Sequence, residues 1–182
     1  MTPADYLATF EVNKEANSTY SLEFQEYILL NKSRFKRWTK LGSIRQDLSE
    51  LIKSINETQY WIIITEPWCG DAAQTLPFLF KLAEMNTHIH VVIQLRDVDS
   101  EIDAYLSKGK KSIPKLIARN KQGADLFHWG PRPKKLELLI SSQKKKSETK
   151  EALKISEQKW YNEDKGQSLQ IELLEHLLTN RT

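Results

Sequence analysis

The sequence has one cysteine, Cys69, among its 182 residues. A single cysteine cannot form a disulfide within the chain, so a disulfide-stapled scaffold is excluded. The sequence also lacks an apolar run near the ~20 residues that span a bilayer, and its first residues lack the basic and apolar regions of a secretory signal. We therefore expect a cytoplasmic protein with no membrane partner.

The sequence also has little excess charge of either sign and lacks the usual cofactor-binding motifs. The formal net charge of +3 is too small to indicate a nucleic-acid partner. The sequence has no Gly-rich phosphate loop, His-Glu-x-x-His or Gly-x-Ser-x-Gly motif, so nucleotide binding, zinc proteolysis and serine hydrolysis lack support. His88 and His90 would share one strand face, but no third ligand accompanies them. We predict no metal site and no cofactor.

The most informative segment is the apolar run from Tyr60 to Thr65 and the motif Glu66-Pro67-Trp68-Cys69-Gly70-Asp71 that follows it. A β-branched run, a turn and then helical spacing predict a buried strand that leads into a helix. Cys69 would lie at the helix start, where free N–H groups and the helix dipole stabilise a thiolate. Asp71 would oppose this with its negative charge.

The remaining sequence predicts alternating helices and strands. We expect a short helix or arm in residues 1–20, helices over 21–41 and 43–55, a strand over 88–95, and a hairpin of strands over 113–118 and 124–129. Residues 134–165 predict one extended or broken helix, and residues 168–178 a terminal helix. This order predicts one α/β domain over residues 1–182 with a mixed sheet of about four strands flanked by helices. Its core would cover about residues 58–141, with helical extensions over 1–57 and 142–182.

Several features of this core occur in a familiar order. Trp68-Cys69-Gly70-Asp71-Ala72 occupies the strand-to-helix turn, Pro77 lies within the helix, Ser112-Ile113-Pro114 starts the hairpin, and a helix closes the core. Together they resemble the thioredoxin-like superfamily, and in particular a bacterial thioredoxin-like subfamily with a Trp-Cys-Gly-Asp motif and helices added at both ends. The resemblance implies a thioredoxin fold in which Pro114 is the cis-proline that faces Cys69.

Two departures from the family pattern bear on the chemistry. Ala72 stands where the family has its second cysteine, so the chain cannot form the intramolecular disulfide of thioredoxin chemistry. Ile63 stands where typical thioredoxins keep a buried acid that assists the second thiol. The resemblance therefore implies monothiol rather than dithiol redox chemistry. Cys69 would form a mixed disulfide with a protein or a low-molecular-weight thiol, and an external thiol would resolve it.

Three hypotheses stay open for this site. The first is a thiol-disulfide oxidoreductase of monothiol type, active in cell redox homeostasis, with Cys69 as its catalytic nucleophile. The second is a redox-inactive binding module that uses the same groove, or the added helices, to hold a protein partner. The third is that Ala72 is an engineered change that traps mixed disulfides. The predicted residues of the substrate groove are Trp68, Gly70, Asp71, Ile113 and Pro114.

Each groove residue has an expected contribution. Trp68 would be an exposed aromatic side chain that contacts the substrate, or else would pack over the turn. Gly70 would allow close approach of a ligand. The backbone of Ile113, held by Pro114, would pair with an extended peptide in the manner of an added strand.

Overall fold

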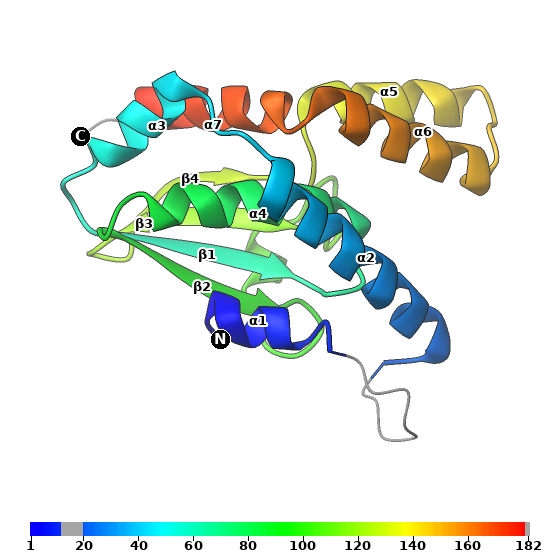
Figure 1. Cartoon of the computed structure of the whole chain (residues 1–182), viewed down its shortest axis with the longest axis horizontal. Coiled ribbons are helices and arrows are strands. Elements are labelled where there is room, and N and C mark those ends of the chain that lie inside the picture. The colour runs from blue at the N-terminus through cyan, green and yellow to red at the C-terminus, as the bar shows by residue number, and fades with distance from the viewer. Residues whose placement is uncertain (12–19, 181–182) are drawn as a thin grey trace.

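The computed structural model describes residues 1–11 and 20–180. Its centre is a four-stranded mixed sheet with helices packed against it (Figure 1). The strands are β1 (Gln59–Thr65), β2 (Ile89–Leu95), β3 (Lys115–Asn120) and β4 (Asp125–Trp129), in the spatial order β2-β1-β3-β4. Strand β1 runs parallel to β2 and antiparallel to β3, and β3 and β4 form an antiparallel hairpin. The predicted α/β fold with a mixed sheet of four strands is confirmed.

Strand β1 is central because its side chains are apolar on both faces. Trp61, Ile63 and Ile64 are fully buried, although successive side chains of a strand point to opposite faces of the sheet. A strand that is covered on both faces has a nearly continuous apolar sequence, since neither face meets water. Ile63, which stands at the family's acid position, therefore contributes only to the core.

The helices precede, connect and follow the strands. Before β1 come α1 (Pro3–Ala8), α2 (Leu22–Leu41) and α3 (Gln46–Lys53); α4 (Gly70–Glu84) connects β1 to β2, and a short 3-10 helix, η1 (Ile102–Ala104), follows β2. After β4 come α5 (Lys134–Lys145), α6 (Lys150–Asp164) and α7 (Gln167–Thr179). The part of the predicted N-terminal arm at residues 12–19 lies outside the described residues.

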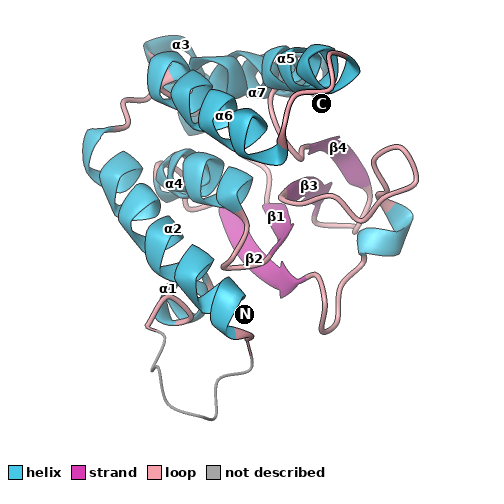
Figure 2. Cartoon of the chain, turned by 90° about the vertical axis from the view of Figure 1, so that its right-hand side faces the viewer, coloured by secondary structure: helices cyan, strands magenta, loops and turns pink. Residues whose placement is uncertain are grey.

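Both predicted helical extensions pack into the core that surrounds the sheet. Helix α2 lies along α4, where the ring centroids of Trp38 and Phe78 are 5.7 Å apart. Helix α7 buries Leu169 and Leu173 in the same hydrophobic cluster as β1. Figure 2 shows α3, α5, α6 and α7 gathered on one side of the molecule, and α2 beside α4. Residues of both extensions therefore contribute to one hydrophobic core. The limits near residues 58 and 141 that the sequence suggests for the thioredoxin-like core stay a prediction.

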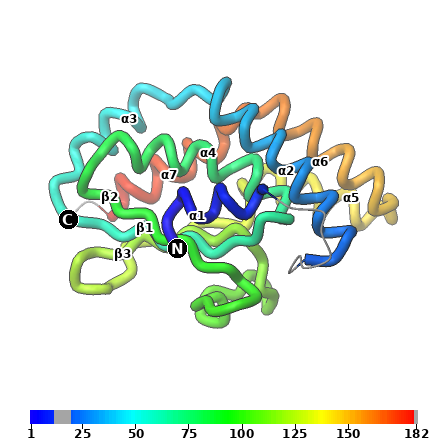
Figure 3. The backbone as a smooth tube through the Cα atoms, turned by 60° about the horizontal axis from the view of Figure 1, so that its bottom comes forward, coloured from blue at the N-terminus to red at the C-terminus, as the bar shows by residue number. Residues whose placement is uncertain are grey.

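Residues 134–165 form two helices, so the predicted helix is broken rather than extended. The chain reverses between α5 and α6, where Ser147 has a φ of 59°. The two helices pack through a small apolar cluster of Leu136, Ile140 and Tyr161. Helix α6 then lies beside α2 (Figure 3), and its Lys154 Nζ donates to Tyr27 Oη of α2 at 2.7 Å. This reversal brings α6 to the start of α4.

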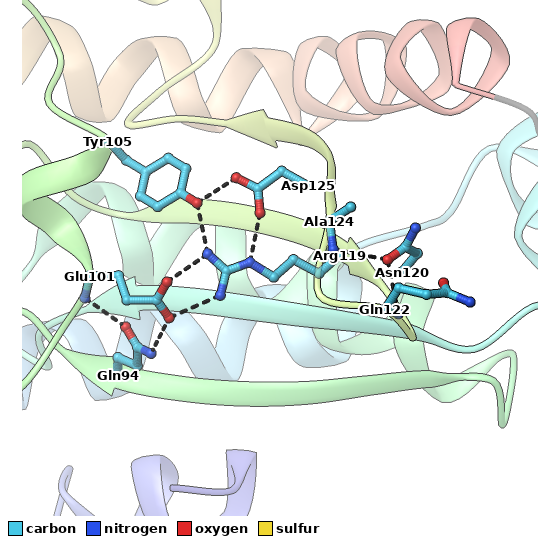
Figure 4. A network of polar contacts seen from close by, with 8 residues as sticks. All are labelled: Gln94, Glu101, Tyr105, Arg119, Asn120, Gln122, Ala124 and Asp125. Carbon is cyan, nitrogen blue, oxygen red and sulfur yellow. Dashed lines mark hydrogen bonds and ion pairs between the residues drawn. The ribbon is translucent and has the colours of Figure 1, made fainter.

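Arg119 on β3 organises a polar network on the sheet (Figure 4). Its guanidinium donates to the two carboxylate oxygens of Glu101 at 3.1 and 2.6 Å, to Asp125 at 2.6 Å and to Tyr105 Oη at 2.7 Å. Bidentate arginine-carboxylate pairs are among the stronger hydrogen-bonded contacts in proteins. The network therefore ties the η1 segment to the β3-β4 hairpin.

We expect Arg119→Met to lower the free energy of unfolding by about 1 to 2 kcal/mol, because Glu101 and Asp125 lose a charge-assisted partner. The Arg119 hydrogen bond lowers the pKa of Glu101, so its stabilising effect is present at neutral pH and is lost as pH falls through that lowered pKa. The deficit, measured by urea unfolding, should therefore shrink in acid. Lys159→Met removes an exposed ion pair with Glu163 at 3.9 Å and should have no measurable effect. An equal loss in both variants would contradict this role of Arg119.

Candidate functional site

Cys69 lies at the junction of β1 and α4, directly before the first residue of the helix. Its side chain is buried, with 7% of the residue exposed. The thiol donates a hydrogen bond to the Ile113 carbonyl oxygen at 3.4 Å. The Ile113-Pro114 peptide bond is cis, as the resemblance implies. The fold thus brings together Cys69, Ile113 and Pro114.

The surroundings of Cys69 favour the neutral thiol. Burial and then the negative charge of Asp71 raise the pKa of Cys69 to about 12. The backbone N–H groups of Ala72 and Asp71 and the guanidinium of Arg132 act in the opposite direction. The helix start therefore favours the thiolate as the sequence predicts, but removal of the thiol from water has the larger effect on its pKa.

Asp71 is buried and is held by residues from other parts of the chain. Its carboxylate accepts hydrogen bonds from Arg132 and from Tyr161 Oη, the latter at 2.6 Å. Arg132 Nη2 also lies 3.4 Å from a carboxylate oxygen of Glu157 on α6. Burial and then the charge of Asp71 raise the pKa of Glu157 to about 8. This cluster of two acids, an arginine and a tyrosine fixes the first turn of α4 against α6.

Trp68 is half-buried and is held by two partners. Its ring stacks on Phe24 of α2 with centroids 4.9 Å apart, and the Arg96 guanidinium lies 4.8 Å from its ring centroid. Stacking and cation-π contacts both fix the orientation of an indole. Trp68 thus packs over the turn and also lines the cavities beside Cys69. Its contact with a substrate stays a prediction.

Two cavities meet at Trp68 and Cys69, which line both of them. The larger, of about 900 Å³, lies between the loop at residues 107–113, the turn Gly130-Pro131-Arg132 and helix α5. We call it the cis-proline groove. The smaller, of about 420 Å³, lies between α2, α6 and the start of α4. Both are large enough to bury a ligand or a short peptide segment.

Four of the five predicted groove residues line these cavities. Ile113 lines the cis-proline groove, whereas Gly70 and Asp71 line the smaller cavity. Pro114 is buried and lines neither cavity. A β-carbon on Gly70 would meet Arg34 Nη1 at 3.7 Å, an ordinary contact, so packing within the chain does not require glycine there. Close approach of a ligand to Gly70 stays a prediction.

Sequence reasoning missed the residues that surround Asp71. Arg132 carries the only local signal, because it stands between Pro131 and Pro133 where the chain leaves the sheet. Glu157 and Tyr161 lie in α6 within no motif, and only the reversal between α5 and α6 brings them to the site. Their contribution could not be read from spacing along the chain.

The described residues hold no group of three or more His, Cys, Asp or Glu side chains placed to bind a metal ion. Among the described helices, none combines the length and the apolar composition that a membrane span requires.

A parallel strand-helix-strand unit, an antiparallel hairpin and a cysteine that faces a cis-proline define a thioredoxin-like protein. A family model described as Thioredoxin matches residues 18–154, which is more than half of the chain. The chain therefore belongs to this thioredoxin family. No curated protein matches the sequence.

Two solved structures are similar to this chain. One is PA1234, a protein of unknown function from Pseudomonas aeruginosa, with 14% identity, coverage of 99% of this chain and 93% of that chain, and a TM-score of 0.64. The other is an HIV epitope scaffold, with 16% identity, coverage of 75% of this chain and 81% of that chain, and a TM-score of 0.50. At these identities the likeness concerns the fold alone.

Proposed function

We propose that this chain is a thioredoxin-fold binding module that holds an extended segment of a partner protein in the cis-proline groove, without a thiolate step at Cys69. The observation that carries the proposal is the state of Cys69, which is buried and hydrogen-bonded to Ile113 with its pKa raised to about 12. A neutral, buried thiol is a poor nucleophile. Its hydrogen bond instead gives the Ile113 carbonyl a partner.

The groove itself supports a peptide ligand. It has a volume of about 900 Å³ and runs past the loop that ends at Ile113. A backbone segment beside a groove can pair with an extended peptide, while side chains of the groove select its sequence. The partner in this proposal is therefore a protein segment rather than a small thiol.

Monothiol redox chemistry is the second candidate, supported by the place of Cys69 in the lining of both cavities. The Cys69 thiolate would attack a substrate disulfide, form a mixed disulfide and release one thiolate, and an external thiol would then displace Cys69. The attacking species is the thiolate, so this function requires the pKa of Cys69 to fall when a substrate binds.

The reactivity of Cys69 separates the two candidates. We expect alkylation of Cys69 at neutral pH to be at least about tenfold slower than that of a free cysteine, because burial keeps the proton on the sulfur. The rate should rise only at alkaline pH, in line with a pKa raised to about 12. Alkylation that is quenched at set times and analysed by mass spectrometry measures this rate across pH. A rate above that of free cysteine at neutral pH would favour the monothiol candidate.

A peptide library tests binding directly. Immobilised peptides probed under reductant should include ligands that bind wild type and Cys69→Ser with the same affinity. Ser112 lines the groove, so Ser112→Trp should fill it and abolish binding, whereas Ser33→Trp on the exposed surface of α2 should not. A second probing without reductant completes the test. If peptides are captured only there, only by wild type, and are released when reductant is added, the binding module is rejected and the monothiol protein is supported.

A further inference from the structure

The cis-proline groove is lined mainly by basic side chains. Of the charged residues that line it, six are basic and Glu137 is acidic. This excess is local, because the whole chain has a formal net charge of only +3. A groove lined by one sign of charge attracts ligands of the opposite sign. The basic residues are Arg96, Lys108, Lys110, Arg132, Lys134 and Lys144.

Half of these basic residues are already paired. Arg132 pairs with Asp71, Arg96 with Asp97, and Lys108 with Glu137. The other half, which are Lys110, Lys134 and Lys144, form no ion pair within the described part of the chain.

The unpaired lysines are spread along the groove. Lys110 lies on the loop side, whereas Lys134 and Lys144 lie in the first and last turns of α5. At 1.5 Å per residue these two positions are about 15 Å apart along the helix axis. A compact anion would reach only one of them. An extended peptide rises about 3.3 Å per residue, so a segment of about five residues spans the same length.

The ion pair between Lys108 and Glu137 bridges the two walls of the groove. The Lys108 Nζ to Glu137 Oε1 distance is 2.8 Å, and the two side chains are 77% and 41% exposed. Exposed pairs of this kind contribute little to stability, so a ligand carboxylate can replace Glu137 at small cost. Lys108 thus becomes available to an acidic ligand.

Apolar side chains in the same groove favour a peptide over a nucleic acid. Leu138 of α5 is 70% exposed and lines the groove together with Ile113 and Pro131. We propose that the cis-proline groove binds an acidic, extended segment of a partner protein, about five residues long, whose carboxylates face Lys110, Lys134 and Lys144. This inference rests on the proposed function and adds the chemistry of its partner.

The test compares two labelled peptides with the full-length protein. One alternates glutamate with valine, and the other has glutamine in place of each glutamate. The acidic peptide should bind on the order of tenfold more tightly than the glutamine peptide. Added salt should weaken binding of the acidic peptide, because salt screens the interaction between exposed charges. If reductant-stable, Cys69-independent peptides from the library are neutral or basic, the acidic preference is wrong although the binding function stands. If no peptide of any charge binds, the binding function itself fails.

Two matched double variants place the interaction in the groove. Lys110→Glu with Lys144→Glu changes two lining residues, whereas Lys111→Glu with Lys145→Glu changes their sequence neighbours, which do not line the groove. Both pairs change the net charge equally. The first double variant should weaken binding of the acidic peptide on the order of tenfold, and the second should weaken it far less. Equal losses would overturn the proposal, because they would indicate a general charge effect.

Glu137→Gln provides a gain of binding that a damaged fold cannot mimic. It removes the acid that competes for Lys108, so the acidic peptide should bind several-fold more tightly while the glutamine peptide is unaffected. Tight competition by a single-stranded oligonucleotide, at peptide-like concentration, would instead assign the groove to nucleic acid and overturn the proposal.

Discussion

Replacing Asp71 by asparagine is expected to lower the free energy of unfolding by about 3 kcal/mol. Asparagine has nearly the same size, so the change removes the charge and leaves the packing. The Asp71 side chain is only 7% exposed and holds both Arg132 and Tyr161. Without it the guanidinium of Arg132, whose side chain is only 21% exposed, loses its main counter-ion, which is more costly than the loss of a surface pair. Urea unfolding followed by circular dichroism measures the change.

Glu157 makes this loss depend on pH. Burial and the charge of Asp71 raise the pKa of Glu157 from 4.5 to about 8, so the folded state keeps a proton that the unfolded state releases. In the wild type, Glu157 therefore reduces stability as pH rises between these two values. In Asp71→Asn, Glu157 ionises more readily and pairs with Arg132, so the deficit should be smaller at about pH 8 than at about pH 5.

The control for this substitution is Asp103→Asn. Asp103 is an exposed acid whose ion pair with Lys111 is 2.8 Å long. Its replacement should cause no measurable loss at either pH, since exposed pairs contribute little. A deficit for Asp71→Asn that equals the control, or that does not vary with pH, would contradict the role of the buried cluster.

The same substitution tests the electrostatics of Cys69. The charge of Asp71 is the second cause, after burial, of the raised Cys69 pKa. Asp71→Asn should therefore lower that pKa and speed alkylation at a fixed pH. The rate should still stay below that of a free cysteine, because burial remains. An unchanged rate in the folded variant would show that Asp71 does not act on the sulfur.

The fold could be predicted from the sequence because its decisive signals are local. The apolar run of β1, the turn that follows it and the helical spacing after Cys69 each depend on neighbouring residues. The sequence does not locate the reversal between α5 and α6, because no glycine or proline interrupts residues 134–165 and the turn uses Ser147 at a positive φ.

The candidate site could be predicted only in part. Cys69 and Pro114 have a recognisable pattern around them, and the structure places the Cys69 thiol against the carbonyl that precedes Pro114. The protonation state of Cys69 had no such signal, because it depends on burial and on the balance between Asp71 and Arg132. The basic groove was also missed, since its lysines come from a loop and a helix that are separated in the sequence.

Replacing Gly130 by alanine is expected to cost about 4 kcal/mol. Gly130 has a φ of 115°, and an added β-carbon would lie 2.2 Å from the Pro114 carbonyl oxygen. This conformation alone costs an L-residue about 1 to 3 kcal/mol. The clash adds to this cost because its partner is a backbone atom, which no side-chain rotation can move.

The clash would also disturb the backbone that borders the cis-proline groove. Lys115 Nζ donates to Gly130 O at 3.1 Å and to Ser107 Oγ at 3.0 Å, and so joins two walls of the cis-proline groove. We therefore expect folded Gly130→Ala to bind groove ligands more weakly than wild type. Gly123→Ala is the matched control, because Gly123 also has a positive φ of 84° but a β-carbon there would meet nothing within 4 Å. It should lose only about 1 kcal/mol and keep full binding. If both alanine variants lost the same stability in urea unfolding, the close approach of Gly130 to Pro114 would not be what requires glycine.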